Sequence, residues 1–102
     1  MMEMNQGKIN VLVADDHAVV RSGLSMLINA EEDMHVVAAV KDGAEAFDQT
    51  MALKPDVVVM DLNMPPGENG LSATARIKEA MPNVKVLILT MHEDQEYLVQ
   101  VL

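Results

Sequence analysis

Acidic side chains follow two apolar runs of the sequence, at the points where buried strands would end. Asp15 and Asp16 come directly after Ile9–Ala14, and Asp61 comes directly after Val57–Met60. Short β-branched apolar runs bounded by turn residues are typical of fully buried strands in a parallel sheet. A carboxylate at the end of such a strand is a candidate nucleophile or metal ligand.

A third strand-like run, Val84–Leu89, is followed by Thr90, whose side chain carries a hydroxyl group. Strand-like runs alternate with helical periodicity along the chain. We expect strands at 9–14, 36–40, 57–60 and 84–89. We expect a first helix at about 18–32 and a second from a cap at Asp42 to Pro55. A third helix should cover Gly70–Met81, and a fourth should begin at about Asp94. This order predicts an α/β domain with a doubly wound parallel sheet, in which ligands bind at the carboxyl ends of the strands. The acidic groups and the hydroxyl should therefore converge at one edge.

Three carboxylates at one edge repel each other. Two charges about 4 Å apart cost roughly 4 kcal/mol at an effective dielectric constant near 20, so a proton or a cation must relieve them. Oxygen ligands select Mg²⁺, Mn²⁺ or Ca²⁺ over zinc, and Mg²⁺ usually combines one or two carboxylates with waters and phosphate oxygens. An Asp carboxylate can attack a phosphoryl group, so the cluster predicts a phosphoryl-handling site with Asp61 as acceptor and Thr90 as a donor to a phosphoryl oxygen.

Each residue also has an ordinary structural interpretation. Asp15 and Asp16 could cap a helix, Asp61 could close a turn, and Thr90 could be a strand-end β-branched residue. We interpret His17 as an N-terminal helix residue rather than as a metal ligand. The expected convergence of three strand ends favours a shared site over three unrelated caps.

The composition limits the classes of partner. The chain has 102 residues and a formal net charge of −9, which disfavours nucleic acid and anionic membranes as direct partners. It has no cysteine, which excludes disulfides and thiolate metal sites, and no apolar run approaches the length of a membrane span. We expect a cytoplasmic domain over residues 8–102, preceded by a disordered segment at 1–7.

The apolar stripe of the first helix is expected to face the sheet. Its members recur at helical spacing, at Val20, Leu24, Leu27 and Ile28.

Several segments resemble the receiver domain of two-component response regulators. The resemblance rests on Val11–His17, Val57–Pro65, Gly70 and Leu87–Thr90. The sequence Val20–Leu24, following Asp15-Asp16-His17, is similar to the NarL/FixJ branch. The loop from Met64 to Thr74 is one residue longer than is usual in that branch, and it is similar to that of oxygen- and nitrate-responsive regulators of Gram-positive bacteria.

The resemblance implies a flavodoxin-like fold with strand order 2-1-3-4 and a role for each site residue. It makes Asp61 the phosphoacceptor for a sensor histidine kinase, and it makes Asp16, Asp61 and the carbonyl of Asn63 ligands of Mg²⁺. Asp15 would act through a metal-bound water. Thr90 would be the switch residue, and Asn63 and His92 would tune the lifetime of the phosphoryl group. A receiver promotes its own phosphorylation and hydrolysis without being a turnover enzyme.

The chain departs from the family pattern after its fourth strand. A fifth parallel strand, its phosphoryl-pairing lysine, a fifth helix and the DNA-binding output domain of the branch find no counterpart in the sequence. None of the lysines at 8, 41, 54, 78 and 85 matches that lysine. An uncovered fourth strand would present an apolar edge, so we expect self-association by strand pairing or by swapping of the last elements.

Two other functions compete with this interpretation. A phosphohydrolase of the haloacid-dehalogenase type also uses a strand-end Asp, but it needs a second Asp two residues later, where this chain has Asn63. A flavin-binding module would need a phosphate loop after the first strand and aromatic residues to stack the ring. The sequence Asp15-Asp16-His17 and the scarcity of aromatic residues oppose it.

Overall fold

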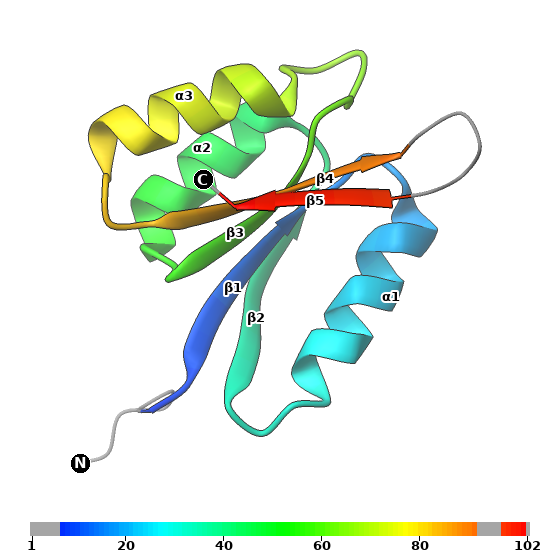
Figure 1. Ribbon diagram of the computed structural model, residues 1–102, viewed down its shortest axis with the longest axis vertical. Coiled ribbons are helices and arrows are strands. Elements are labelled where there is room, and N and C mark those ends of the chain that lie inside the picture. The colour runs from blue at the N-terminus through cyan, green and yellow to red at the C-terminus, as the bar shows by residue number, and fades with distance from the viewer. Residues whose placement is uncertain (1–6, 92–96, 102) are drawn as a thin grey trace.

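The described part of the chain forms one twisted five-stranded sheet with three helices (Figure 1). The computed structural model describes residues 7–91 and 97–101. Its elements, in chain order, are β1 (Ile9–Ala14), α1 (Ala18–Asn29), β2 (Met34–Val40), α2 (Gly43–Leu53), β3 (Val57–Asp61), α3 (Gly70–Ala80), β4 (Lys85–Met91) and β5 (Tyr97–Val101). The strand order is β2-β1-β3-β4-β5, with the first four strands parallel and β5 antiparallel to β4. The predicted order 2-1-3-4 and the first three helices are confirmed.

The prediction of a helix from about Asp94 is wrong for the described residues. Residues 97–101 form β5, which pairs with β4 from Leu87↔Val101 to Met91↔Tyr97; residues 92–96 lie outside the described residues. The sequence offers a physical reason, since Tyr97, Val99 and Val101 alternate and such residue types favour strands. The edge of β4 is therefore already paired within the chain, so the expectation of an exposed β4 edge is also wrong.

Polar side chains cap the second and third helices. Asp42 is the N-cap of α2, and its side chain accepts a hydrogen bond from the backbone N–H of Glu45 at 2.9 Å. Asn69 caps α3 by accepting from the backbone N–H of Ser72 at 2.8 Å. Caps of this kind satisfy backbone donors that the helix cannot pair itself. They fix where each helix begins next to the carboxyl edge of the sheet.

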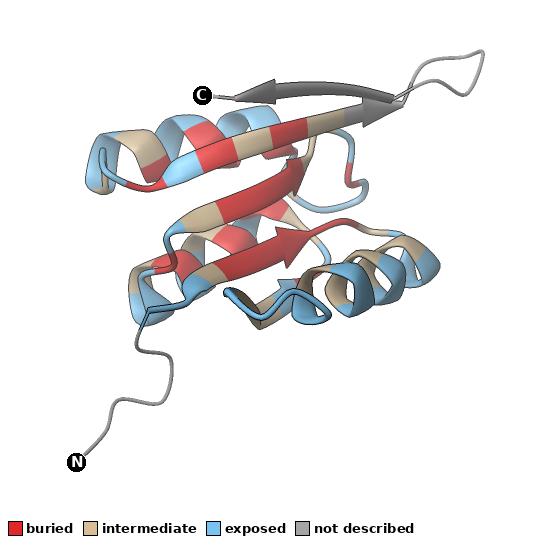
Figure 2. Cartoon of the chain, turned by 60° about the horizontal axis from the view of Figure 1, so that its bottom comes forward, coloured by how far each residue is buried: buried red, intermediate tan, exposed pale blue. Residues whose placement is uncertain are grey.

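One face of the sheet carries a closed core beneath α2 and α3. The alternate residues Leu12, Val58, Met60 and Val86 point to this face, and each is fully buried. Ala46 of α2 and Ala73 and Ile77 of α3 meet them. Figure 2 shows the buried residues concentrated along the central strands and the facing sides of these helices. Because side chains alternate along a strand, this pattern fixes which residues point the other way.

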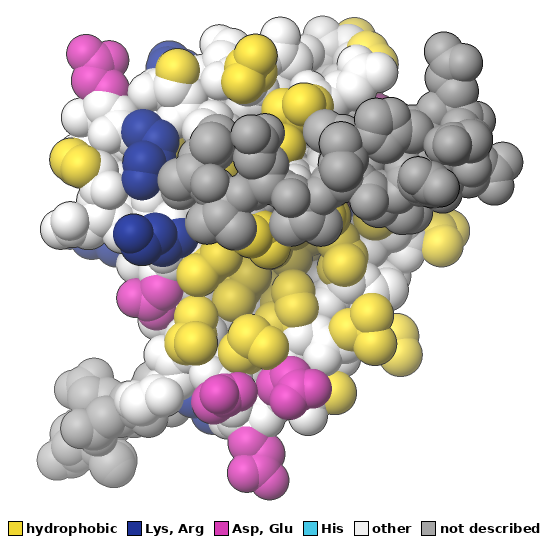
Figure 3. Space-filling model, in the orientation of Figure 1, with side chains coloured by type: hydrophobic (Ala, Val, Ile, Leu, Met, Phe, Trp, Pro, Cys, Tyr) yellow, Lys and Arg dark blue, Asp and Glu magenta, His cyan; other side chains and the backbone are white. Residues whose placement is uncertain are grey.

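The opposite face is covered more thinly, by α1. Val11, Val13 and Val59 are buried there, with Leu24 and Ile28 of α1 packed against them as partly buried neighbours. No residue of α1 is itself buried, and Leu27, which we expected in the core-facing stripe, is 70% exposed. Figure 3 shows hydrophobic side chains gathered on this face beside α1. In the part of the chain that the structure describes, α1 is the only helix on this face.

None of the helices described is long and apolar enough to cross a membrane.

Candidate functional site

The acidic residues singled out in the sequence do converge at the carboxyl edge of the sheet. Asp15 and Asp16 follow β1, and Asp61 is the last residue of β3, the strand paired beside it. Side-chain ligand atoms of Asp15, Asp16, His17 and Asp61 all lie within 4.8 Å of one another. This brings together the three predicted carboxylates and adds His17 to them.

Asp15 is held rigidly at this edge. It is only 6% exposed, and its backbone N–H donates to the carbonyl of Val40 at 3.0 Å. Its Oδ1 accepts from the backbone N–H of His17 at 2.8 Å, and its carbonyl accepts from Arg21 Nη1 at 2.9 Å. The N-cap position of α1 belongs to His17, whose side chain makes no cap hydrogen bond. Asp15 therefore braces the turn before α1, and neither acidic residue after β1 occupies the cap position.

Asp61 is half-buried at the end of β3, in an environment that disfavours its charge. Burial raises the pKa of the Asp61 carboxyl, the negative charge of Asp15 raises it further, and a hydrogen bond from Asn63 opposes the rise. That bond runs from the backbone N–H of Asn63 to Asp61 Oδ1 at 3.4 Å. Gly70 lies against the same backbone, since a Cβ placed on it would lie 2.0 Å from the Asp61 carbonyl oxygen. The glycine thus allows α3 to begin directly against the backbone of Asp61.

His17 is a site residue that the sequence reasoning missed. Its Nδ1 lies 3.1 Å from Asp15 Oδ1 and 3.0 Å from Asp16 Oδ1, while the side chain remains 60% exposed. The hydrogen bond with Asp15 and the negative charges of Asp16 and Asp15 raise the pKa of His17. The available signal was its position directly after two carboxylates at a strand end. The turn that bends the ring back over them could not be inferred from spacing alone.

The donor set fits a hard divalent cation. It offers three carboxylates, and Oδ1 of Asp16 is buried without a hydrogen-bond partner. The nearby His17 Nδ1 lies within ion-pair distance of this oxygen but does not meet the geometry of a hydrogen bond. A buried, unpaired carboxylate oxygen is costly unless a cation or a donor reaches it. The acidic cluster is therefore compatible with Mg²⁺.

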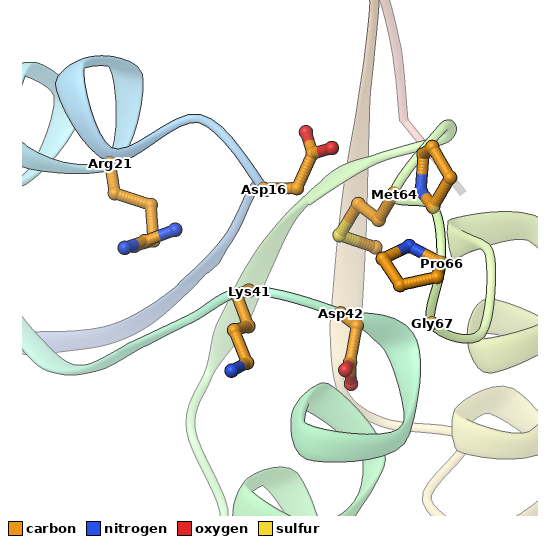
Figure 4. Close-up of a pocket in the computed structure, with 8 residues that line it drawn as sticks. Asp16, Arg21, Lys41, Asp42, Met64, Pro66 and Gly67 are labelled. Atoms are coloured by element: carbon orange, nitrogen blue, oxygen red, sulfur yellow. The ribbon is translucent and has the colours of Figure 1, made fainter.

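A cavity of about 470 Å³ opens beside this cluster. Asp16 contributes to its wall, Arg21 and Lys41 lie on one side, and Met64 and Pro66 lie on the other (Figure 4). The lining comes from the loops that follow β1, β2 and β3 and from Arg21 in the first turn of α1. The cavity gives the carboxyl edge a recess with both acidic and basic groups next to Asp16.

Some predicted site residues are only partly described. The backbone of Thr90 lies in β4, paired with β5, but its side chain lies outside the described residues, as does all of His92. Asn63 is exposed and directly follows the acceptor strand. Lys85 pairs with Val57 at the start of β4, at the opposite end of the strand from the site, as expected.

Comparisons with known proteins agree with this geometry. The response regulator receiver domain family matches residues 11–102. The oxygen regulatory protein NreC of Staphylococcus haemolyticus is 57% identical over 94 residues, and that of Staphylococcus aureus is 55% identical over the same length. In both cases the match covers 92% of this chain and 43% of the relative. The chain therefore spans less than half the length of these curated relatives.

Solved structures show the same fold. A two-component response regulator of the LuxR family from Aurantimonas superposes with a TM-score of 0.78 at 37% identity, covering 84% of this chain and 61% of that one. The response regulator domain of Thermotoga maritima CheB gives a TM-score of 0.78 at 39% identity, over 86% and 66% of the two chains. A DNA-binding response regulator of the LuxR family from Staphylococcus aureus gives 0.76 at 29% identity, over 83% and 70%. The chain belongs to the response regulator receiver domain family, in its NarL-type branch.

Proposed function

We propose that this chain is a phosphoacceptor receiver, in which Asp61 takes a phosphoryl group from a sensor histidine kinase in a Mg²⁺-dependent reaction. The observation that carries the proposal is the convergence of Asp15, Asp16 and Asp61 within 4.8 Å at the carboxyl edge of a receiver-family sheet. Asp61 combines partial exposure with a fixed position at the end of a buried strand. These are the properties that a positioned nucleophile requires.

Each site residue has a separate role in the proposed phosphoryl transfer. A carboxylate oxygen of Asp61 attacks the phosphorus, and the bond from phosphorus to the kinase imidazole nitrogen breaks. Asp16 and Asp61, with the backbone carbonyl of Asn63, would hold Mg²⁺, and Asp15 would act through a water. When bound, the cation neutralises charge on the cluster and on the transferring oxygens. The hydroxyl of Thr90 would then donate a hydrogen bond to a phosphoryl oxygen. This bond would couple phosphorylation of Asp61 to a conformational change in the rest of the domain.

The consequences for the complete protein follow from its relatives. The first curated relatives are named oxygen regulatory proteins, and one structural neighbour is described as a DNA-binding response regulator. We propose that phosphorylation of Asp61 controls transcription through a DNA-binding output domain, in the cytoplasm, and that Asp61 phosphate is hydrolysed slowly without turnover of an external substrate. The phosphohydrolase alternative is not favoured, because Asn63 lacks the carboxylate that such an enzyme needs.

Intact-mass spectrometry after incubation with acetyl phosphate and Mg²⁺ tests this proposal. We expect the addition of one base-labile phosphoryl group, lost in Asp61→Asn and lost when EDTA replaces Mg²⁺. The matched control is Asp56→Asn, because Asp56 flanks the same strand at its other end, away from the cluster. The control should be modified like the parent. Absence of modification in the parent, or continuous phosphate release without a modified protein, would contradict the proposal.

A further inference from the structure

We propose that His17 is a direct ligand of the divalent cation at this site and that its imidazole shifts the preference of the site from Mg²⁺ toward Mn²⁺. The inference rests on the proposed function, because it concerns the same cation. It differs from the interpretation of His17 from sequence as an N-terminal helix residue that is not a metal ligand. The ring is turned back over the two carboxylates rather than outward along the helix.

The distances match the edge of an octahedral coordination shell. With metal–ligand bonds of about 2.1 Å, adjacent ligands of an octahedral cation lie about 3.0 Å apart and opposite ligands about 4.2 Å apart. His17 Nδ1 lies 3.1 Å from Asp15 Oδ1 and 3.0 Å from Asp16 Oδ1. Asp61 completes a group whose ligand atoms fall within 4.8 Å. Four donors from two strand ends thus gather at one place, where Asp16, Asp61 and His17 would contact the cation and Asp15 would act through a water.

The helix itself gives the ring no reason to take this position. His17 is the N-cap residue of α1, yet its side chain caps no backbone N–H of the helix. Its ring hydrogen-bonds only Asp15 among the residues that the structure describes. The turn is already closed by the backbone N–H of His17, which donates to Asp15 Oδ1 at 2.8 Å. A cation would replace the contacts of the ring nitrogen with Asp15 and Asp16, so the ring can become a ligand without loss of the local fold.

A second observation, at Asp16, is compatible with a cation at this place. Asp16 Oδ1 is buried and has no hydrogen-bond partner, although the imidazole nitrogen lies 3.0 Å away. In the metal-bound form Nδ1 would present its lone pair to the cation and the ring proton would sit on Nε2. The ring is largely exposed, so Nε2–H can be hydrated.

The chemistry of imidazole predicts which cation benefits. Carboxylate, carbonyl and water ligands suit Mg²⁺ and Mn²⁺ alike, whereas an imidazole ligand suits transition metals better. Mg²⁺ also gives up its waters reluctantly, so it gains little from an added neutral nitrogen. A site with three carboxylates and one histidine should therefore bind Mn²⁺ more tightly relative to Mg²⁺ than the same site without the histidine.

Binding titrations and electron spin echo spectroscopy of the Mn²⁺-loaded protein test the inference. In the parent chain we expect ¹⁴N modulation from a coordinated imidazole. In His17→Ala we expect this modulation to disappear and Mn²⁺ affinity to fall at least about tenfold, the lower end of what loss of an outer-shell partner causes at metal sites. Mg²⁺ affinity should change by less than twofold. The Ala variant keeps the backbone N–H that donates to Asp15, so the turn before α1 remains closed.

His35→Ala is the matched control, because His35 lies in β2 opposite Asn10, at the amino end of the sheet. It should leave both the ¹⁴N modulation and the ratio of Mn²⁺ to Mg²⁺ affinity unchanged. An unchanged ratio in His17→Ala, or no ¹⁴N modulation in the parent, would overturn the inference while leaving the proposed function intact. Failure of the parent to bind either cation would overturn both.

Discussion

Val58 and Val59 are neighbours on β3, but their side chains enter two different environments. Val58 is fully buried in the core closed by α2 and α3, whereas Val59 is 7% exposed in the smaller cluster beneath α1. The first cluster is surrounded by buried residues of two helices, while the second has only partly buried helical neighbours. Packing that excludes water on all sides contributes most to stability, because both burial and dispersion contacts are complete.

Residues that stabilise the fold and the residue that serves the chemistry lie next to each other along β3. Residues 58 and 60 point into the closed core, and Asp61 follows immediately at the edge. Packing on the closed face can thus fix the position and direction of the strand end, while the acceptor carboxylate stays half-exposed. The thinly covered face can vary in packing at less cost to the fold.

Removing a large side chain from the closed face should be strongly destabilising. Met60 is fully buried among residues of β1, α2 and α3. We expect Met60→Ala to lower the free energy of unfolding by about 2 to 5 kcal/mol, because it removes buried apolar surface and leaves a cavity. Urea denaturation measures this change. Met26→Ala is the control, since Met26 is 73% exposed on α1 and its loss should stay within about 0.5 kcal/mol. An equal loss of unfolding free energy in the two methionine variants would contradict this difference between the closed face and the surface of α1.

Two adjacent valines allow the two faces of the sheet to be compared with the same substitution. Val58 points to the closed face and is fully buried, while Val57 is half-buried on the other face. We expect Val58→Ala to cost about 2 kcal/mol of unfolding free energy and Val57→Ala about half of that or less, in proportion to the apolar area and cavity involved. The same denaturation experiment measures both. A larger loss at Val57 would mean that the α1 face is the better packed of the two.

The acidic edge should make a smaller contribution that depends on pH. The folded chain raises the pKa of Asp61 above its usual value of 3.8 and that of His17 above 6.5. A group with a raised pKa in the folded state contributes stability below its unfolded pKa and loses it as pH rises through the folded value. In EDTA, the contribution of Asp61 to Tm should therefore fall as pH rises in a window above pH 3.8, and that of His17 in a window above pH 6.5.

Single variants assign each window to its residue. Asp61→Asn should abolish the acidic window, and His17→Ala should abolish the one above pH 6.5, as followed by Tm from pH 3 to pH 9. Mg²⁺ should reduce the loss in the acidic window, because a bound cation stabilises the ionised carboxylate of Asp61. A Tm that rises with pH through both windows would show that the cluster does not disfavour negative charge.

The site could be predicted from sequence because topology, not detailed packing, brings it together. Asp15, Asp16 and Asp61 follow short buried runs, and parallel strands place their carboxyl ends at one edge. The helical spacing of Leu98 and Leu102 predicts a helix for the last residues, although the alternation of Tyr97, Val99 and Val101 is equally regular. Backbone pairing available at the edge of β4 decided in favour of a strand.

Two further differences arise from tertiary contacts that no local pattern contains. Leu27 belongs to the apolar stripe of α1, but its exposure depends on how α1 is tilted and on what else covers that face. The orientation of the His17 ring depends on the turn closed by Asp15. Spacing predicts which residues share an element, whereas these positions are set by how two elements meet.

Locating the phosphoryl group on the chain tests whether Asp61 is the Mg²⁺-dependent phosphoacceptor. After incubation with acetyl phosphate, borohydride reduction converts an aspartyl phosphate to homoserine, which peptide mass spectrometry can assign to one residue. We predict homoserine at position 61 when Mg²⁺ is present and none when EDTA replaces it. Homoserine at another aspartate, or equal conversion with and without the cation, would contradict the claim.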